Sequence, residues 1–259
     1  MPELPEAETI ARTLAPHIEG RRIVAALYLT QRVYRGNPAP DLAGRTIVRV
    51  GRHGKTVVCE LDRGCLAFHL GMTGQLLLGS GTGPYTRAVL ALDDGALRFD
   101  DVRQFGRLWL LDAPQERAGP DALALAPGDL AGMLRGRRGA LKPLLLNQKF
   151  VRGIGNIYAD EILFRIRVHP RRRADSLGEK VLRQMHRELQ RILKEAIRAG
   201  GTSVRSYVDA TGAIGGFQNL LGVYGKEGET CPVCGTSIQR ERVGGRSSFF
   251  CPLCQPLAK

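Results

Sequence analysis

The chain has 259 residues, of which 38 are lysine or arginine and 25 are aspartate or glutamate, so its formal net charge is +13. Hydrophobic residues make up 43% of it, enough for one large or two smaller domains. No apolar run approaches the ~20 residues of a membrane span, and the N-terminus lacks the layout of a signal peptide, so we expect a cytoplasmic protein. A folded protein this basic usually binds a polyanion. Nucleic acid is the first candidate, and a ribosome or an anionic membrane surface are the alternatives.

The chain opens with Met1-Pro2-Glu3-Leu4-Pro5-Glu6. Removal of Met1 would expose Pro2 as a secondary amine, and an α-amino group titrates at about pH 8, so part of it is the free base at neutral pH. Such an amine can attack a sugar carbon and leave a cationic iminium, which is covalent catalysis by Schiff-base chemistry. The alternative is an efficiently processed start without a catalytic role, and these residues alone do not decide between the two.

From Pro5 to about Ile18 the pattern predicts an amphipathic helix, because its apolar residues share one face and Gly20 follows as a stop. Between Ile23 and Asp112 it changes to short β-rich runs separated by turns, which suggests an antiparallel sandwich or barrel. Cys59 and Cys65 fall in these runs and are predicted to be buried thiols. The expected strands are Thr46–Val50, Thr56–Leu61, Cys65–Leu70, Gln75–Leu78, Arg87–Leu92, Ala96–Phe99 and Arg107–Leu111.

A connector rich in proline, alanine and glycine follows at Ala113–Pro127 and predicts a domain boundary. Ser176 and Glu179 form an expected capping box at the start of a long helix. Thr211–Gln218 contains three glycines and predicts a mobile loop. The expected helical stretches beyond the connector are Leu134–Gln148, Asn156–Ile166 and about Leu177–Ala199.

The tail has the spacing C-x2-C-x16-C-x2-C, formed by Cys231, Cys234, Cys251 and Cys254. Each pair can aim two thiolates at one ion, and four thiolates suit tetrahedral zinc. With all four positions filled by protein, the zinc would be structural. The alternative is two disulfides, which a cytoplasmic location disfavours. The arginines between the pairs (Arg240, Arg242 and Arg246) point to phosphate contact.

Four segments occur in order: Pro2–Glu6, His69-Leu70-Gly71-Met72-Thr73-Gly74, Gly153-Ile154-Gly155-Asn156-Ile157-Tyr158, and the tail that begins Cys231-Pro232-Val233-Cys234-Gly235. Together they resemble the formamidopyrimidine-DNA glycosylases over essentially the whole length. Leu4 favours this branch over the sister endonuclease VIII branch. The resemblance implies an α+β fold. Residues 1–114 would form an N-terminal antiparallel β-sandwich with a helix, 115–227 a helical helix-two-turn-helix domain, and 228–259 a zinc-finger β-hairpin.

The resemblance also implies a bifunctional DNA glycosylase and AP lyase of base excision repair. Such enzymes flip a damaged purine, for example 8-oxoguanine or a formamidopyrimidine, out of duplex DNA. By the matching positions, Pro2 is the nucleophile, Glu3 moves the protons, and Glu6 supports them. Lys55 matches the lysine that assists β-elimination, and Arg246 matches the arginine of δ-elimination and phosphate binding.

Further matching positions imply DNA contacts. Met72, Arg103 and Phe105 form a wedge that fills the void left by the flipped base, and Asn156 binds a phosphate at a helix start. Tyr85, Arg137, Arg138 and Lys142 are the other expected DNA contacts, and Thr211–Gln218 is the loop that closes over the lesion. Three residues depart from the usual pattern and leave details of DNA binding open: Tyr85 replaces a histidine, Val102 a proline and Gln104 an arginine. The implied partners are damaged double-stranded DNA and one zinc ion, with the protein a monomer located with the nucleoid and not at a membrane.

Two rival interpretations remain. One is an enzyme of the same family that prefers oxidised pyrimidines, against which Leu4 and the full-length loop after Gly200 argue. The other is a non-catalytic zinc-finger protein that binds DNA. It would account for the charge and the tail, but it leaves Pro2 and Glu3 without a role.

Overall fold

The structure is a computed structural model that describes residues 2–36, 39–112 and 119–257. The chain divides into two compact units, one formed by Met1–Glu116 with Ala196–Gln218 and the other by Arg117–Glu195 with Asn219–Lys259. Met1 and the expected boundary after residue 114 lie outside the described residues. The division into 1–114, 115–227 and 228–259 therefore stays a prediction.

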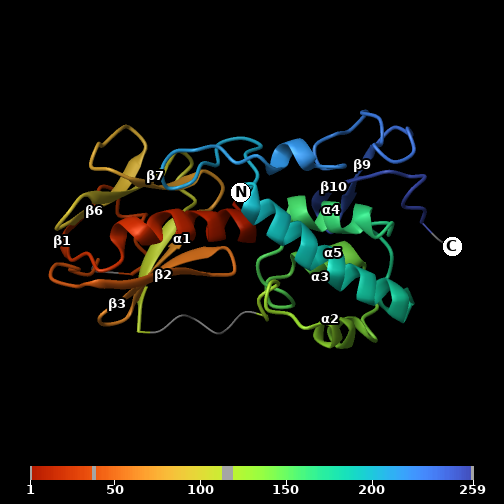
Figure 1. Cartoon of the computed structure of the whole chain (residues 1–259), viewed down its shortest axis with the longest axis horizontal. Helices are drawn as coiled ribbons and strands as arrows, with labels where there is room; N and C mark the ends of the chain where they lie inside the picture. The colour runs from red at the N-terminus through yellow and green to blue at the C-terminus, as the bar shows by residue number, and fades with distance from the viewer. Residues whose placement is uncertain (1, 37–38, 113–118, 258–259) are drawn as a thin grey trace. The chain divides into compact units, whose positions relative to one another are not determined.

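The first unit begins with helix α1 (Leu4–Ile18), as the sequence predicts. Pro5 stands in its first turn, where the missing N–H costs no helical hydrogen bond. The apolar face, with Ile10 and Leu14 fully buried, packs on strands β2 (Ile47–His53) and β3 (Thr56–Leu61). Figure 1 shows α1 lying along the β-structure of this unit.

Two antiparallel four-stranded sheets make up most of this unit, in the orders β1-β6-β7-β5 and β2-β3-β4-β8. Side chains from both sheets share one core with α1, and the rings of Phe68 and Phe99 meet with centroids 6.2 Å apart. Cys59 and Cys65 are buried free thiols, as predicted. The remaining strands are β1 (Ile23–Tyr28), β4 (Cys65–His69), β5 (Gly74–Leu78), β6 (Thr86–Leu92), β7 (Ala96–Asp101) and β8 (Arg107–Leu111).

The segment Ala196–Gln218 returns to the first unit from late in the chain. Ala210 accepts a hydrogen bond from the N–H of Leu78 at 2.9 Å and donates its own N–H to Thr13 Oγ1 at 3.2 Å. Within the glycine-rich loop, Gly216 donates to Ala199 O at 2.7 Å. The loop thus has a defined, hydrogen-bonded conformation, and its expected mobility stays a prediction.

The second unit is helical and carries the cysteine tail. Its helices are α2 (Pro127–Leu134), α3 (Leu141–Leu146), α4 (Asn156–Arg165) and α5 (Glu179–Arg198), with short 3-10 turns η1 (Ala174–Ser176) and η2 (Phe217–Leu220) along the chain. Strands β9 (Gln239–Val243) and β10 (Arg246–Phe250) form the tail hairpin. The expected α+β fold, with N-terminal antiparallel sheets, a helical region and a terminal hairpin, is confirmed. No described helix is both long and apolar enough to cross a bilayer.

Two helix predictions are wrong in detail. Within the expected stretch Leu134–Gln148, Leu134 is the last residue of α2 and only Leu141–Leu146 forms a further helix. The helix is interrupted because Gly136 has a left-handed φ of 71° and Ala140 pairs as a β-bridge with Arg173. The expected capping box is also absent at Ser176. Its hydroxyl donates to Arg173 O at 2.8 Å, whereas Gly178 O accepts the N–H groups of Val181 and Leu182 in the first turn of α5. A serine hydroxyl can bond to nearby backbone in a turn as readily as at a helix N-cap. The Ser176/Glu179 spacing alone therefore predicted the wrong N-cap for α5.

Candidate active site

The N-terminal carboxylates lie in an enclosed, hydrogen-bonded position. Pro2 is buried, and Glu3 and Glu6 are 2% and 1% exposed. Glu6 Oε2 accepts the Glu3 N–H at 2.7 Å, and Oε1 accepts the Thr202 N–H at 2.8 Å. Both acceptors are thus used by backbone groups, and the helix N-terminus favours negative charge here. Glu6 fixes the residue that follows Pro2 and ties it to the returning segment.

Tyr207, which belongs to the returning segment, is buried close enough to Glu6 to interact with its charge. Its hydroxyl donates to Gly200 O at 3.1 Å. Burial, reinforced by the negative charge of Glu6, raises the pKa of Tyr207 above its ordinary value of 10.0. The phenol therefore stays protonated, and it serves as a neutral donor beside the carboxylate.

Lys55 lies in the turn between β2 and β3, and it is half-buried. The turn follows from Gly54, whose φ is 61°. Thr56, the next residue, pairs with His69 at the end of β4. Burial first and then the Lys55 ammonium lower the pKa of His69 below 6.5. The structure therefore brings Lys55 into electrostatic contact with the first residue of the His69–Gly74 motif.

The three expected wedge residues meet at one place on the surface. Arg103 Nη1 lies 3.1 Å from Met72 Sδ, and the Arg103 Cζ lies 4.6 Å from the centroid of the Phe105 ring. Met72 is 38% exposed and Phe105 51%. Met72 and Phe105 therefore form an exposed apolar pair, and the Arg103 guanidinium contacts both. Residues of a hydrophobic core would be buried, so this exposure argues against a core role.

The departures from the family pattern lie around this cluster. Tyr85 is 51% exposed, and its carbonyl accepts the Asp101 N–H at 2.9 Å. Val102 is 53% exposed, and Gln104 has a left-handed φ of 55°. Asp101 itself, whose carboxylate faces this cluster, was missed by sequence reasoning. An aspartate that ends a strand two residues before Arg103 is its only sequence signal.

Asn156 opens helix α4 in the second unit, after the N-cap Gly155. Its Oδ1 is buried and, in the described part of the chain, accepts no hydrogen bond. The N–H groups of a helix start attract phosphate. An amide in this position can turn its NH₂ toward such a ligand, and the phosphate-binding role of Asn156 stays a prediction.

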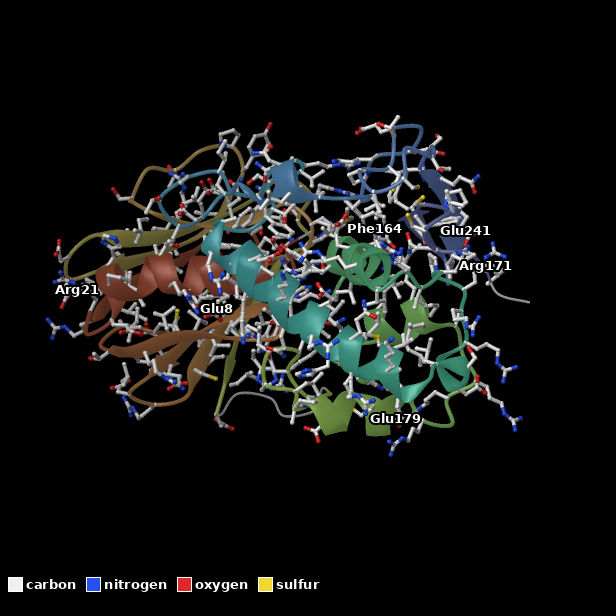
Figure 2. The ribbon with its side chains drawn as sticks, turned by 45° about the vertical axis from the view of Figure 1, so that its right-hand side comes forward. Glu8, Arg21, Phe164, Arg171, Glu179 and Glu241 are labelled. Atoms are coloured by element: carbon white, nitrogen blue, oxygen red, sulfur yellow. The ribbon has the colours of Figure 1, made fainter. Side chains whose placement is uncertain are left out.

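The other basic residues expected at DNA differ in their surroundings. Arg137 and Arg138 are exposed in the link between α2 and α3, with the Arg137 guanidinium 5.7 Å from the Phe150 ring. Because both side chains are exposed, Arg137 and Arg138 are available to a phosphate. Arg171, in contrast, is paired with Glu241 of β9 at 3.0 Å (Figure 2).

The predicted DNA contact of Lys142 is wrong for this structure, because its side chain is fully buried. Its Nζ lies 2.7 Å from Asp160 Oδ1 and donates to Ser247 O and Ser248 Oγ at 2.7 and 2.8 Å. Burial raises the pKa of Asp160 to about 7, against the opposing effect of the Lys142 ammonium. The ammonium binds α4 and β10 together and does not reach solvent.

The four cysteines of the tail converge as predicted. Their Sγ atoms lie within 4.8 Å of one another, with Cys231 3.9 Å from Cys254 and Cys234 3.4 Å from Cys251. These spacings exceed the ~2.05 Å of a disulfide, so the disulfide alternative is wrong. They match the roughly 3.8 Å edge of a tetrahedron with Zn–S of ~2.3 Å. The cluster fits one structural zinc ion.

Arg246 is the exposed first residue of β10. It follows the two-residue turn Gly244-Gly245, in which both φ angles are positive, 57° and 78°. Glycine adopts these positive φ angles without strain. The turn sets Arg246 at the tip of the hairpin, where its guanidinium is open to a ligand.

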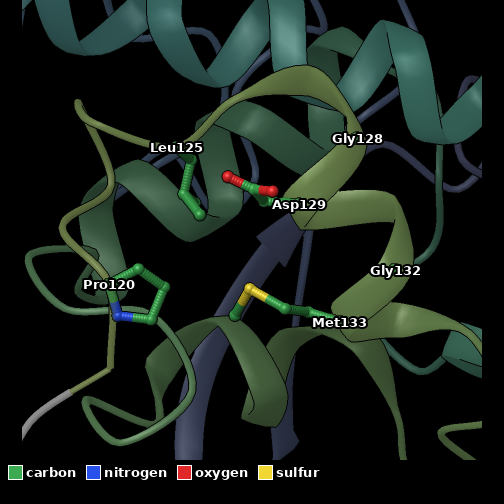
Figure 3. A pocket seen from close by; sticks show the side chains of 6 residues that line it. All are labelled: Pro120, Leu125, Gly128, Asp129, Gly132 and Met133. Carbon is green, nitrogen blue, oxygen red and sulfur yellow. The ribbon is translucent and has the colours of Figure 1, made fainter.

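An open, largely apolar pocket of about 480 Å³ lies beside α2 (Figure 3). Its lining includes Leu125, Met133 and the single carboxylate of Asp129. It contains none of the residues predicted to act on DNA, and one carboxylate supplies no acid–base pair. The candidate functional groups are therefore those described above within each unit, and not the lining of this pocket.

Comparison with known proteins identifies three consecutive matches. Residues 1–108 match the formamidopyrimidine-DNA glycosylase N-terminal domain, 119–208 its H2TH domain, and 228–257 the zinc finger found in FPG and IleRS. The chain is 46% identical to the formamidopyrimidine-DNA glycosylase of Solibacter usitatus, covering 98% of this chain and 99% of that protein. It is 40% identical to that of Bacillus subtilis, with 98% and 99% covered.

Solved structures are similar over the whole length as well. The crystal structure of MutM (FPG) from Thermus thermophilus has a TM-score of 0.91 at 40% identity, with both chains fully covered. A Lactococcus lactis FPG mutant, in complex with a Fapy-dG containing DNA, has a TM-score of 0.92 at 35% identity, with 99% of this chain and 100% of that chain covered.

Proposed function

Because this chain belongs to the formamidopyrimidine-DNA glycosylase family, we propose that it excises oxidised purines from duplex DNA and then cleaves the strand, using Pro2 as the nucleophile. It would act as a monomer on damaged double-stranded DNA, in the cytoplasm with the chromosome. The observation that carries the proposal is the double hydrogen bond of Glu6, which holds the Pro2–Glu3 pair against Thr202. A protein that only bound DNA would have no use for a buried carboxylate pair beside its N-terminus.

The first stage removes the base. The Pro2 nitrogen, freed by removal of Met1, attacks C1′ of the flipped nucleotide, and the base leaves with the electron pair of the glycosidic bond. The proton of the nitrogen passes to the departing base, and Glu3 in its acid form delivers a proton to the ring oxygen as the sugar opens. The result is an iminium between Pro2 and C1′. Glu6 holds the backbone of Glu3, and so the adjacent Pro2, in a fixed position during these steps.

The second stage cleaves the strand. The iminium acidifies the C2′–H, and loss of that proton expels the 3′ phosphate, a step that Lys55 assists by its charge. A further elimination expels the 5′ phosphate, with Arg246 binding the phosphate that leaves. Water then releases Pro2, and a one-nucleotide gap flanked by phosphates remains. The zinc ion, when bound to the four cysteines, holds the hairpin that carries Arg246.

Borohydride reduction with an abasic-site duplex tests the nucleophile. We expect a covalent protein–DNA adduct that maps to the N-terminal peptide by mass spectrometry, with Met1 absent. Pro2→Gly should reduce the trapped yield, and Glu3→Gln should abolish release of a damaged base because the proton donor is lost. No adduct with the native protein would favour a non-catalytic DNA-binding protein. Full yield with Pro2→Gly would contradict the role of the proline as the nucleophile.

A panel of duplexes with single lesions decides the substrate class. We expect faster release of 8-oxoguanine and formamidopyrimidines than of oxidised pyrimidines. The reverse order would support the rival enzyme of the same family, although it would leave the role of Pro2 intact.

A further inference from the structure

Two surface loops carry the wedge residues: residues 70–73, between β4 and β5, and residues 102–106, between β7 and β8. We call them the wedge loops. Their backbones touch, since a Cβ on Gly71 would lie 2.7 Å from Gly106 N and 2.8 Å from Phe105 C. Gly71 also has a left-handed φ of 59°. The two loops can therefore meet only with glycine at this position.

The carboxylate of Asp101, which is 1% exposed, joins both wedge loops. Its Oδ1 accepts Thr73 Oγ1–H at 2.5 Å from the first loop. The Arg103 N–H of the second loop is shared between this Oδ1 at 3.2 Å and Thr73 Oγ1 at 3.1 Å. Its Oδ2 accepts the Gly106 N–H at 2.7 Å. Hydrogen bonds to an ionised acceptor are stronger than neutral ones. One buried carboxylate thus sets the distance between Met72 and its two partners.

The second wedge loop needs such support because it contains a strained residue. Gln104 has a left-handed φ of 55° and lies between Arg103 and Phe105. Such a conformation persists only where the surrounding contacts fix it. Arg107 Nη1 donates to Gln104 O at 2.7 Å and to Gly106 O at 2.6 Å, and Asp101 holds both ends of the same loop.

We propose that Asp101 is a positioning residue for base displacement, which holds Met72, Arg103 and Phe105 assembled before DNA binds. This inference rests on the proposed function, because the wedge has a task only where a base is flipped. Three donors converge on the carboxylate. An asparagine offers one acceptor oxygen in its place and turns an NH₂ group toward donors, so the loops would lose their shared anchor.

The test compares Asp101→Asn with Asp100→Asn. Asp100 is the preceding residue of β7 and pairs instead with Arg98 Nε at 3.0 Å, so the control makes the same change of charge without touching the wedge loops. Each variant is assayed on a duplex with a formamidopyrimidine and on a single-stranded abasic oligonucleotide, which has no stack to open. We expect Asp101→Asn to slow base release from the duplex by roughly tenfold or more, as for a lost buried hydrogen bond to a charged group. Trapping on the single strand should stay within about twofold of the native rate, and Asp100→Asn should change neither.

Wedge insertion is also read directly with 2-aminopurine placed beside an abasic-site analogue in the duplex. Binding should raise its fluorescence with the native protein and Asp100→Asn, and far less with Asp101→Asn. Thr73→Val removes the hydroxyl that donates to Asp101 and accepts the Arg103 N–H, with little change of volume, and should show a loss in the same direction. An equal fall on both substrates, or an unchanged 2-aminopurine response in Asp101→Asn and Thr73→Val, would overturn the proposal. The 2-aminopurine signal reports DNA distortion on binding and does not depend on base excision or Schiff-base formation. It therefore tests the role of Asp101 even if the native protein gives no trapped adduct.

Discussion

At the scale of single residues, Glu6 illustrates how local chemistry and distant packing combine. Its bond to the Glu3 N–H is the ordinary bond of a helix N-terminus, three residues apart in the chain. Its bond to Thr202 joins positions 196 residues apart. The first could be expected from the sequence, whereas the second depends on the return of Ala196–Gln218 to the first unit. A residue expected only to support the nucleophile therefore also connects it to the returning segment Ala196–Gln218.

His69 gives a pH prediction. In the unfolded chain its imidazole takes up a proton near its ordinary pKa of 6.5, whereas in the folded protein burial and Lys55 lower that pKa. Between the two values the unfolded state binds more protons, so stability falls as the pH drops below 6.5. His69→Gln should reduce this loss by at most about 1.4 kcal/mol per pH unit.

The measurement is the urea midpoint at pH 7.5 and 5.5, followed through Trp109. This is the only tryptophan in the chain, and it lies in β8, which pairs with the strand of His69. The same substitution at His17, exposed on α1, is the matched control. A pH dependence that is identical in the native protein and in His69→Gln would refute the assignment.

At the scale of elements, the sequence predicted most helices and strands to within a few residues, because their periodicities are local. Lys142 shows where such reasoning ends. It follows a run of arginines and so resembles a solvated basic surface, yet α3 packs on α4 and directs it at Asp160. The partner lies on the next helix, and nothing in the spacing marks it. The wedge cluster was found by resemblance, whereas its anchor Asp101 needed the three-dimensional contacts.

The Lys142–Asp160 pair gives a stability prediction for the second unit. Lys142→Met leaves the Asp160 carboxylate buried without its cation, which typically costs about 3–5 kcal/mol. Adding Asp160→Asn should restore part of this loss, because the amide oxygen can still accept the Phe249 N–H. Urea unfolding followed by far-UV circular dichroism, with zinc content measured in parallel, checks both variants.

Lys149→Met is the control for this pair, since Lys149 is exposed in the loop after α3. We expect it to change the unfolding free energy by less than about 0.5 kcal/mol. A double variant no more stable than Lys142→Met would show that the two charges do not act as a pair.

At the scale of the whole molecule, the charge of +13 is divided between neutralised and open positions. Arg173 is paired with Asp175 at 2.6 Å, and Arg171 with Glu241. Arg246, by contrast, stands exposed at the tip of the hairpin. Net charge alone predicts a polyanion partner but does not say which cations release counterions. The structure distinguishes arginines that are already paired with a carboxylate, such as Arg173, from arginines that are exposed and can bind a phosphate, such as Arg246.

This separation predicts how DNA affinity depends on salt. Each phosphate contact adds about −0.9 to the slope of log K against log salt concentration on duplex DNA. Arg246→Ala should therefore weaken binding to every sequence and flatten the slope by about one contact. Arg173→Ala removes an equal charge, but together with Asp175 it contributes little net field, so its slope should stay native. Fluorescence anisotropy with an abasic-analogue duplex between about 50 and 200 mM salt gives both slopes. A native slope in Arg246→Ala, or an equal flattening in Arg173→Ala, would mean that total charge and not the hairpin arginine sets the affinity.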